Sequence, residues 1–189
     1  RVLFRSWSPD GNEVVPNIAE SWEVNEDGTR YTFHLRKGVK FHNGREMTAD
    51  DVKYSLDRVT NPATQSPGAG FFGSIAGFDK AGDGGLSGVE VVDPATVKIT
   101  LTRPDATFLH VMALNFSFVV PKEVVEAEGA DFGKKPVGTG AYKLAEWTLG
   151  QRLVFEKNAD YWRPGVPFLD SIVFEVGQEP VVALLRLQN

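Results

Sequence analysis

Three glycines at positions 68, 70 and 73 have the spacing of a dinucleotide-binding loop, G-x-G-x-x-G. In such a site the glycines follow a buried strand and open a helix, whose N-terminus holds the pyrophosphate. The seven residues before Gly68 are Asn-Pro-Ala-Thr-Gln-Ser-Pro, and this stretch cannot be that strand. We therefore interpret residues 68–73 as part of a glycine-rich loop and expect no cofactor there.

The histidines do not have the spacing of a metal site. His34, His42 and His110 are scattered along the chain, and none has a second ligand at the spacing that puts two ligands on one helix face. The chain also has no Cys, which excludes disulfides, thiolate nucleophiles and Cys-ligated metals. The sequence predicts no metal and no cofactor.

The neighbouring acids Asp50 and Asp51 suggest an acid–base pair, but adjacent residues of a helix point about 100° apart. Both follow Thr48, a favoured N-cap residue, and carboxylates in the first turn are stabilised by the helix dipole. Capping is therefore the better interpretation. No G-x-S-x-G nucleophile elbow occurs either, so the sequence predicts a protein that is not an enzyme.

Aromatic side chains are the remaining candidates for ligand contact. Phe71 and Phe72 lie in a glycine-rich stretch, residues 64–88, which we expect to form a long loop. Exposed aromatic residues on a loop are harder to explain by packing than aromatic residues in strands. Phe71 and Phe72 are therefore candidate ligand contacts. Three tryptophans follow strand patterns and are expected in the core: Trp22, Trp147 and Trp162.

The composition is that of an ordinary globular domain. The 189 residues carry a net charge of −5, with 42% hydrophobic and 24% charged residues, which is enough apolar material to bury a core. An acidic balance lacks the basic footprint that nucleic acid requires, so we expect no nucleic-acid partner. No apolar run in the sequence approaches the roughly 20 residues that span a bilayer.

Periodicity and turn signals predict a mixture of hairpins and short helices. Asp27-Gly28 between two alternating apolar runs is a strong hairpin signal. Val52, Leu56 and Val59 recur at helical spacing. Strands are expected over 22–24, 31–35, 88–92, 96–101, 116–120, 141–147, 152–157 and 169–176. Helices are expected over 49–59, 104–114, 121–128 and 180–189, with a short one near 71–75.

The order of several segments resembles one family, the extracytoplasmic solute-binding proteins of peptide and nickel ABC transporters, family 5. The similarity runs in register from about Ser8 to the C-terminus. The segments that carry it are Pro16–Trp22, Asp27–Gly44, Thr48–Val52, Gly138–Leu144 and Glu156–Trp162.

That resemblance implies an α/β (mixed α+β) fold, the type II periplasmic-binding-protein fold, of which this chain would be an N-terminal fragment truncated at both ends. Residues 1–118 would form most of the family's extra small domain, and residues 119–189 would be part of the first lobe. A second lobe with charged anchors for peptide termini would lie beyond Asn189. Gly138, Thr139 and Gly140 would return toward the hinge, where they are candidate ligand contacts; a tight turn before a strand is the alternative.

The function implied by the resemblance is capture of di- to oligopeptides outside the membrane and delivery to ABC permease subunits. The protein would be periplasmic or extracellular, attached to the membrane only through a signal or lipid anchor missing from this chain, and monomeric at full length. The alternatives are another solute, such as a nickel chelate or a glycan, or a sensory domain on the same scaffold. By itself the chain would bind peptides far more weakly than an intact relative.

Overall fold

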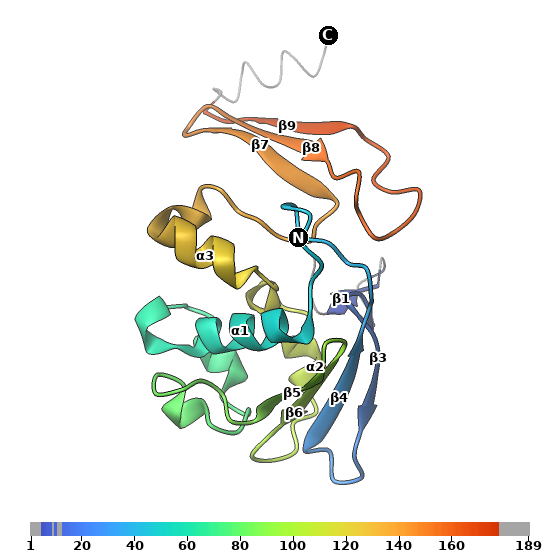
Figure 1. Ribbon diagram of the computed structural model, residues 1–189, viewed down its shortest axis with the longest axis vertical. Coiled ribbons are helices and arrows are strands. Elements are labelled where there is room, and N and C mark those ends of the chain that lie inside the picture. Colours follow the sequence, from blue (N-terminus) through green and yellow to red (C-terminus); the bar gives the residue numbers. More distant parts are fainter. Residues whose placement is uncertain (1–4, 9, 11–12, 178–189) are drawn as a thin grey trace.

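The computed structural model describes residues 5–8, 10 and 13–177, and in this part of the chain three antiparallel sheets are accompanied by short helices (Figure 1). The mixed α/β class expected from the sequence is confirmed. A two-stranded sheet pairs β1 (Arg5–Trp7) with β2 (Val14–Pro16). A four-stranded sheet has the order β3 (Ala19–Val24), β4 (Arg30–Leu35), β6 (Thr96–Thr100) and β5 (Val89–Asp93). A three-stranded sheet contains β7 (Tyr142–Thr148), β8 (Arg152–Lys157) and β9 (Ser171–Glu175).

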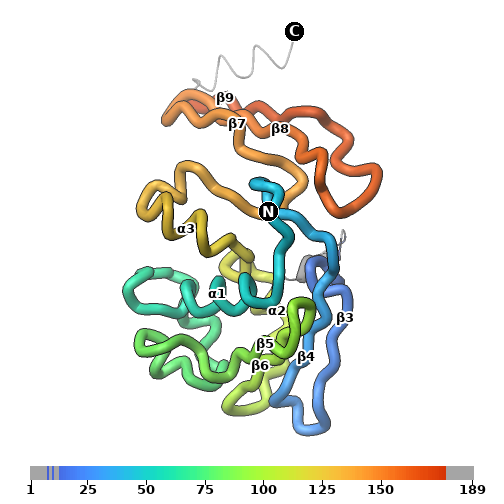
Figure 2. The backbone as a smooth tube through the Cα atoms, viewed as in Figure 1, coloured from blue at the N-terminus to red at the C-terminus, as the bar shows by residue number. Residues whose placement is uncertain are grey.

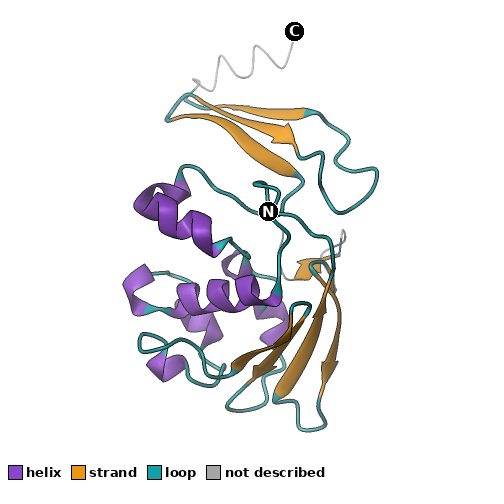
Figure 3. Ribbon diagram, in the orientation of Figure 1, coloured by secondary structure: helices purple, strands orange, loops and turns teal. Residues whose placement is uncertain are grey.

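The helices lie mostly to one side of the four-stranded sheet (Figure 3). They are α1 (Ala49–Thr60), α2 (Phe108–Val111) and α3 (Lys122–Glu128). Single turns of 3-10 helix are η1 (Pro62–Thr64), η2 (Ala69–Phe72), η3 (Phe78–Lys80), η4 (Asn115–Ser117) and η5 (Gly129–Gly133). In the part of the chain that the structure describes, no helix is long and apolar enough to cross a bilayer.

The main core lies between the four-stranded sheet and α1. Strand β4 alternates as its sequence predicts, so that Tyr31, Phe33 and Leu35 are buried on one face. Helix α1 places Val52 and Leu56 against this layer through the expected i, i+4 spacing. The hairpins over β3–β4 and β5–β6 and the helix over residues 49–59 are confirmed, with ends that differ by a few residues.

Two predicted elements are wrong, because local hydrogen bonds compete with regular structure. The helix expected over 104–114 is reduced to α2, since the Asp105 carboxylate accepts hydrogen bonds from the Thr107 N–H (2.9 Å) and hydroxyl (2.6 Å). The strand expected over 116–120 is absent. The N–H of Val120 instead donates to the Ser55 hydroxyl of α1 at 2.9 Å. The helix expected over 180–189 lies outside the described residues.

The two loop phenylalanines lie in different environments. Phe72 is fully buried in the main core, so the expectation that it is exposed is wrong, and it has no surface to offer a ligand. The turn of η2 directs Phe72 inward and leaves Phe71 half-exposed, with its ring stacked on Phe116 at 5.7 Å between centroids. Trp22 and Trp162 pack against the core as expected, whereas Trp147 is 42% exposed.

The exposure of Trp147 has a local reason. It lies on one apolar face of the three-stranded sheet, where it pairs across the ladder with Leu153, and Leu153 in turn pairs with Phe174. The three-stranded sheet lies at one end of the molecule (Figure 1). Of Phe174, 53% is exposed as well. The strand pattern is therefore correct, but no described element covers this part of the face.

Gly68, the first glycine of the G-x-G-x-x-G motif, allows a close packing contact. A Cβ built on Gly68 would lie 2.1 Å from Cγ of Phe116, so the Phe116 ring packs directly against the backbone at this position. The segment before it contains η1 and no strand, whereas a dinucleotide-binding loop follows a buried strand. Gly70, two residues further on, has no atom within 4 Å of a built Cβ.

The substitution Gly68→Ala is expected to lower the free energy of unfolding by about 1–3 kcal/mol, because the Phe116 ring must move. Gly70→Ala is the matched control and should stay within about 0.5 kcal/mol of the parent. Urea unfolding followed by circular dichroism measures both. Equal stability of the two variants would show that the packing of Gly68 against Phe116 has no energetic weight.

Candidate functional site

The segment 138–140 connects the helical side of the molecule to β7, and a single histidine holds it in place. The chain runs from α3 through this segment into the three-stranded sheet (Figure 2). The backbone N–H of His42 donates to the Gly138 carbonyl at 2.8 Å. The Gly138 N–H in turn donates to Nδ1 of His42 (3.4 Å), and Nε2 lies 3.1 Å from the Gly140 carbonyl. His42 therefore binds the backbone on both sides of Thr139.

These contacts fix the charge and tautomer of the ring. A backbone N–H can only donate, so Nδ1 must be unprotonated to accept from Gly138. The Gly140 carbonyl can only accept, so Nε2 must carry the proton. The neutral Nε2–H imidazole satisfies both partners, and a protonated ring cannot. Burial, together with the nearby charge of Lys143, lowers the pKa of His42 below its ordinary value of 6.5, although the bond to Gly140 acts in the opposite direction.

The contacts between His42 and residues 138–140 are called the joint, and two further side chains complete it. The Asn158 amide, buried after β8, donates to the same Gly140 carbonyl at 2.9 Å. Lys143 of β7 donates to the His42 carbonyl at 3.3 Å. The turn over residues 40–46, closed by the bridge between Lys40 and Glu46, is called the His42 loop. The three-stranded sheet is thus connected to the His42 loop by side chains as well as by the chain itself.

Arg45 anchors the other side of the His42 loop. Its guanidinium contacts Asp51 in the first turn of α1 at 2.6 Å and Glu123 in the first turn of α3 at 2.7 Å. The two carboxylates raise the pKa of Arg45 above its ordinary value, and Arg45 lowers the pKa of Glu123. The Asp51 carboxylate also accepts from the Thr48 N–H at 2.9 Å, so its capping role is confirmed. One cation therefore fixes the loop relative to both helices.

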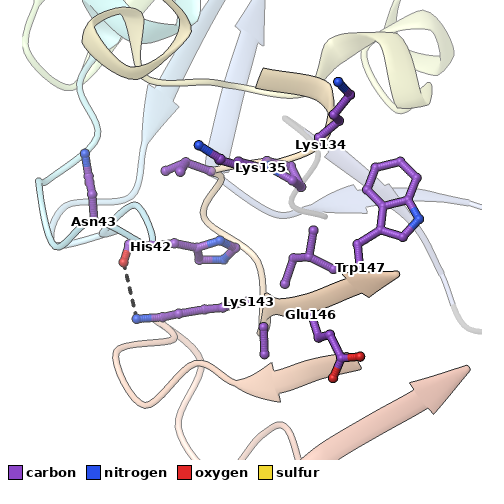
Figure 4. Close-up of a pocket in the computed structure, with 11 residues that line it drawn as sticks. His42, Asn43, Lys134, Lys135, Lys143, Glu146 and Trp147 are labelled. Carbon is purple, nitrogen blue, oxygen red and sulfur yellow. Dashed lines mark hydrogen bonds between the residues drawn. The ribbon is translucent and has the colours of Figure 1, made fainter. Parts of the chain in front are cut away.

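A larger cavity of about 580 Å³, with several charged side chains in its wall, lies beside the joint (Figure 4). Its lysines do not form a free cationic cluster. Lys134 pairs with Asp131 at 2.7 Å, Lys135 pairs with Glu128 at 3.1 Å, and Lys143 donates to a carbonyl. Two of these three lysines are therefore paired with carboxylates, whereas Lys143 keeps its charge beside His42. The lining residues are His42, Asn43, Lys134, Lys135, Pro136, Val137, Lys143, Leu144, Ala145, Glu146 and Trp147.

A smaller, apolar cavity of about 340 Å³ adjoins it. The two cavities share His42, Pro136, Val137 and Leu144 in their walls. The apolar cavity is lined by His42, Phe118, Val119, Val120, Phe132, Pro136, Val137, Gly138, Thr139, Tyr142, Leu144 and Phe155. Thr139 is only 2% exposed, and its hydroxyl has no hydrogen-bond partner in the described part of the chain.

The structure separates the two sets of predicted site residues. Gly138 and Thr139 line the apolar cavity, and Gly140 contributes the carbonyl that His42 and Asn158 share. Phe71 and Phe72 line neither cavity. Sequence reasoning missed His42, because its partners lie nearly a hundred residues away along the chain. Within the described ranges, no group of three His, Asp or Glu side chains could hold a metal ion.

His42 makes stability depend on pH in a defined direction. Because its pKa is lower in the folded state, the unfolded chain binds the proton first as pH falls. The contribution of the neutral His42 ring to the free energy of unfolding is complete above about pH 6.5, the ordinary pKa of histidine. It is lost progressively below that pH. Between about pH 7.5 and about pH 5.5, the wild-type protein should lose more unfolding free energy than His42→Gln, which cannot titrate there.

Urea unfolding at the two pH values measures this difference. His34→Gln controls for loss of an imidazole elsewhere, since His34 lies at the surface beside Glu23. An identical pH dependence of wild type and His42→Gln would contradict the assignment of a neutral ring to His42.

The family model described as bacterial extracellular solute-binding proteins, family 5 Middle, matches residues 13–189. The dipeptide-binding protein of Escherichia coli (strain K12) is 38% identical over 194 residues, which cover 94% of this chain and 35% of that protein. The chain therefore spans about a third of the length of this relative.

Solved structures agree over the whole chain. A periplasmic oligopeptide-binding protein of Borrelia burgdorferi superposes with a TM-score of 0.91 at 29% identity, over 100% of this chain and 39% of that one. Haemophilus influenzae OppA in complex with the peptide RPPGFSPFR superposes with a TM-score of 0.87 at 30% identity, over 99% of this chain and 38% of that one.

Proposed function

Because this chain belongs to the bacterial extracellular solute-binding proteins of family 5, we propose that it is part of the peptide-capturing component of an ABC transporter. The observation that carries the proposal is similarity over nearly the full chain to a dipeptide-binding protein and to a structure that holds a peptide. Both the sequence and the fold of this chain match the corresponding third of those proteins.

Capture in such a protein is a shift of population between an open and a closed form. A ligand that contacts both lobes stabilises the closed form by its extra contacts there. In this arrangement residues 1–118 supply most of the small extra domain, and residues 119–189 belong to the first lobe. The joint at 138–140 lies after the boundary between them, and hydrogen bonds with His42 make it a defined connection rather than a loose linker.

The proposal includes the partners and the location. The protein works outside the cytoplasm, either in the periplasm or attached to the outer side of the membrane by a lipid anchor, and passes its peptide to permease subunits as a monomer. It binds its solute without chemical change. The protein holds an extended peptide mainly through the peptide's own backbone, which is the same in every sequence. Many different peptides are therefore accepted.

Titration calorimetry of the full-length protein with trialanine tests this function. Binding at micromolar affinity or tighter is expected, with a rise in the thermal unfolding midpoint, because ligand binds only the folded state. A nickel–histidine chelate and a disaccharide serve as solutes of the alternative classes. Saturable binding of either control, with none of di-, tri- or pentapeptides, would contradict the proposal.

The 189-residue chain by itself should bind trialanine far more weakly than the full-length protein, because contacts from the second lobe are then missing. The same calorimetry measures the difference. A circular dichroism spectrum with a cooperative thermal transition confirms that the chain is folded during the measurement. Equal affinities would mean that these residues alone hold the peptide.

A further inference from the structure

We propose that Asn43 is a site of spontaneous deamidation, at which the folded protein loses a side-chain amide as ammonia and the residue becomes aspartate or isoaspartate. This inference goes beyond the proposed function and does not depend on which solute the protein binds. Asn43 lies on the His42 loop, directly after His42 (Figure 4). The modification therefore changes the loop on which the joint depends.

Asn43 is followed by glycine, and no other asparagine of this sequence is. Deamidation begins when the backbone nitrogen of the next residue attacks the side-chain amide, and a side chain on that next residue hinders the approach. Gly44 has none, its φ is +90°, and a Cβ built on it has no atom of a more distant residue within 4 Å. Both residues are exposed, so water reaches them. The site thus offers the open space and the solvent that the reaction needs.

The reaction consumes water and no other reactant. The Gly44 nitrogen gives up its proton and forms a bond to Cγ of Asn43. The bond between Cγ and Nδ2 then breaks, and the amide nitrogen takes up a proton and leaves as ammonia. Water opens the resulting succinimide ring at either of its two carbonyl carbons. One opening gives aspartate and the other isoaspartate, and each product carries one new negative charge.

Two backbone N–H groups of the His42 loop act on this reaction in opposite directions. The Arg45 N–H donates to Oδ1 of Asn43 at 3.2 Å, in an Asx turn that folds the side chain over the Gly44 backbone. Negative charge develops on Oδ1 during the attack, so this donor favours the reaction. The Gly44 N–H donates to the Phe41 carbonyl at 2.9 Å, and this bond occupies the attacking nitrogen. Deamidation therefore requires one hydrogen bond of the loop to open.

Glu123 of α3 restrains the amide that leaves. Its carboxylate accepts from Nδ2 of Asn43 at 3.3 Å and pairs with Arg45 at 2.7 Å. In the aspartate product, Glu123 faces a second carboxylate in place of a donor, and like charges repel. Isoaspartate also adds one carbon atom to the backbone, so the turn between Phe41 and Arg45 cannot close with the same contacts. The modification therefore weakens the attachment of the His42 loop to α3.

The first test incubates the full-length protein in mildly alkaline buffer and follows residues 41–45, which trypsin releases as one peptide, by mass spectrometry. A sample digested without incubation corrects for conversion during digestion. The reference is the synthetic peptide Phe-His-Asn-Gly-Arg with blocked ends. The folded protein should convert about fivefold more slowly, the factor that corresponds to one ordinary hydrogen bond, and in urea the two rates should agree. An Asn43 amide that stays intact in the folded protein after the peptide has reacted completely would overturn the proposal.

The second test releases the amide with Glu123→Ala. Without the carboxylate that holds Nδ2, the rate of conversion at Asn43 should rise by about twofold or more. Glu126→Ala is the matched control, since Glu126 lies on the same helix but pairs with Lys122, and it should keep the wild-type rate. The same rate in both variants would overturn the restraining role of Glu123.

The third test measures what the modification does to the loop. The isoaspartate form is separated by chromatography, identified by its peptide over residues 41–45, and unfolded by heat. Its thermal midpoint should lie below those of the unmodified protein and of Asn43→Asp, which carries the new charge without the added backbone atom. A midpoint equal to that of the unmodified protein would overturn the conclusion that the modification weakens the His42 loop.

Discussion

The contacts of one neutral imidazole ring decide how the two sides of this molecule are joined. His42 accepts from one side of Thr139 and lies within hydrogen-bonding distance of the carbonyl on the other. With both neighbours fixed, Thr139 is held in the wall of the apolar cavity, and its hydroxyl oxygen is enclosed by protein. The arrangement depends on the ring staying neutral, which burial favours.

The His42 loop is itself fixed by charge. Arg45 lies three residues after His42 and binds carboxylates at the starts of two helices. Its planar fork can contact both acids at once, which an ammonium group would do less well. Because α3 leads into the segment that His42 binds, the same cation helps to place both partners of the joint. The ion pairs of Arg45 and the hydrogen bonds of the neutral His42 ring thus support the same connection.

Local patterns in the sequence were sufficient for most of the fold. Asp27-Gly28 specified a hairpin and Thr48 the start of α1, because turn and cap preferences act over a few residues. The same reasoning failed where short-range hydrogen bonds competed, as at Asp105, and where burial depended on distant packing, as at Phe72. Thr139 was found from a resemblance. His42, which binds the neighbouring Gly138 and Gly140, was not, since no local signal links residues that meet only after folding.

The uncovered end of the three-stranded sheet has a practical consequence. Trp147 is the most exposed of the tryptophans whose side chains are described, and it forms part of the wall of the larger cavity. An indole in contact with water emits at longer wavelength than one enclosed by protein. Trp147 is therefore an intrinsic fluorophore in the wall of this cavity. The wavelength of its emission maximum would report, without any label, when that wall becomes covered.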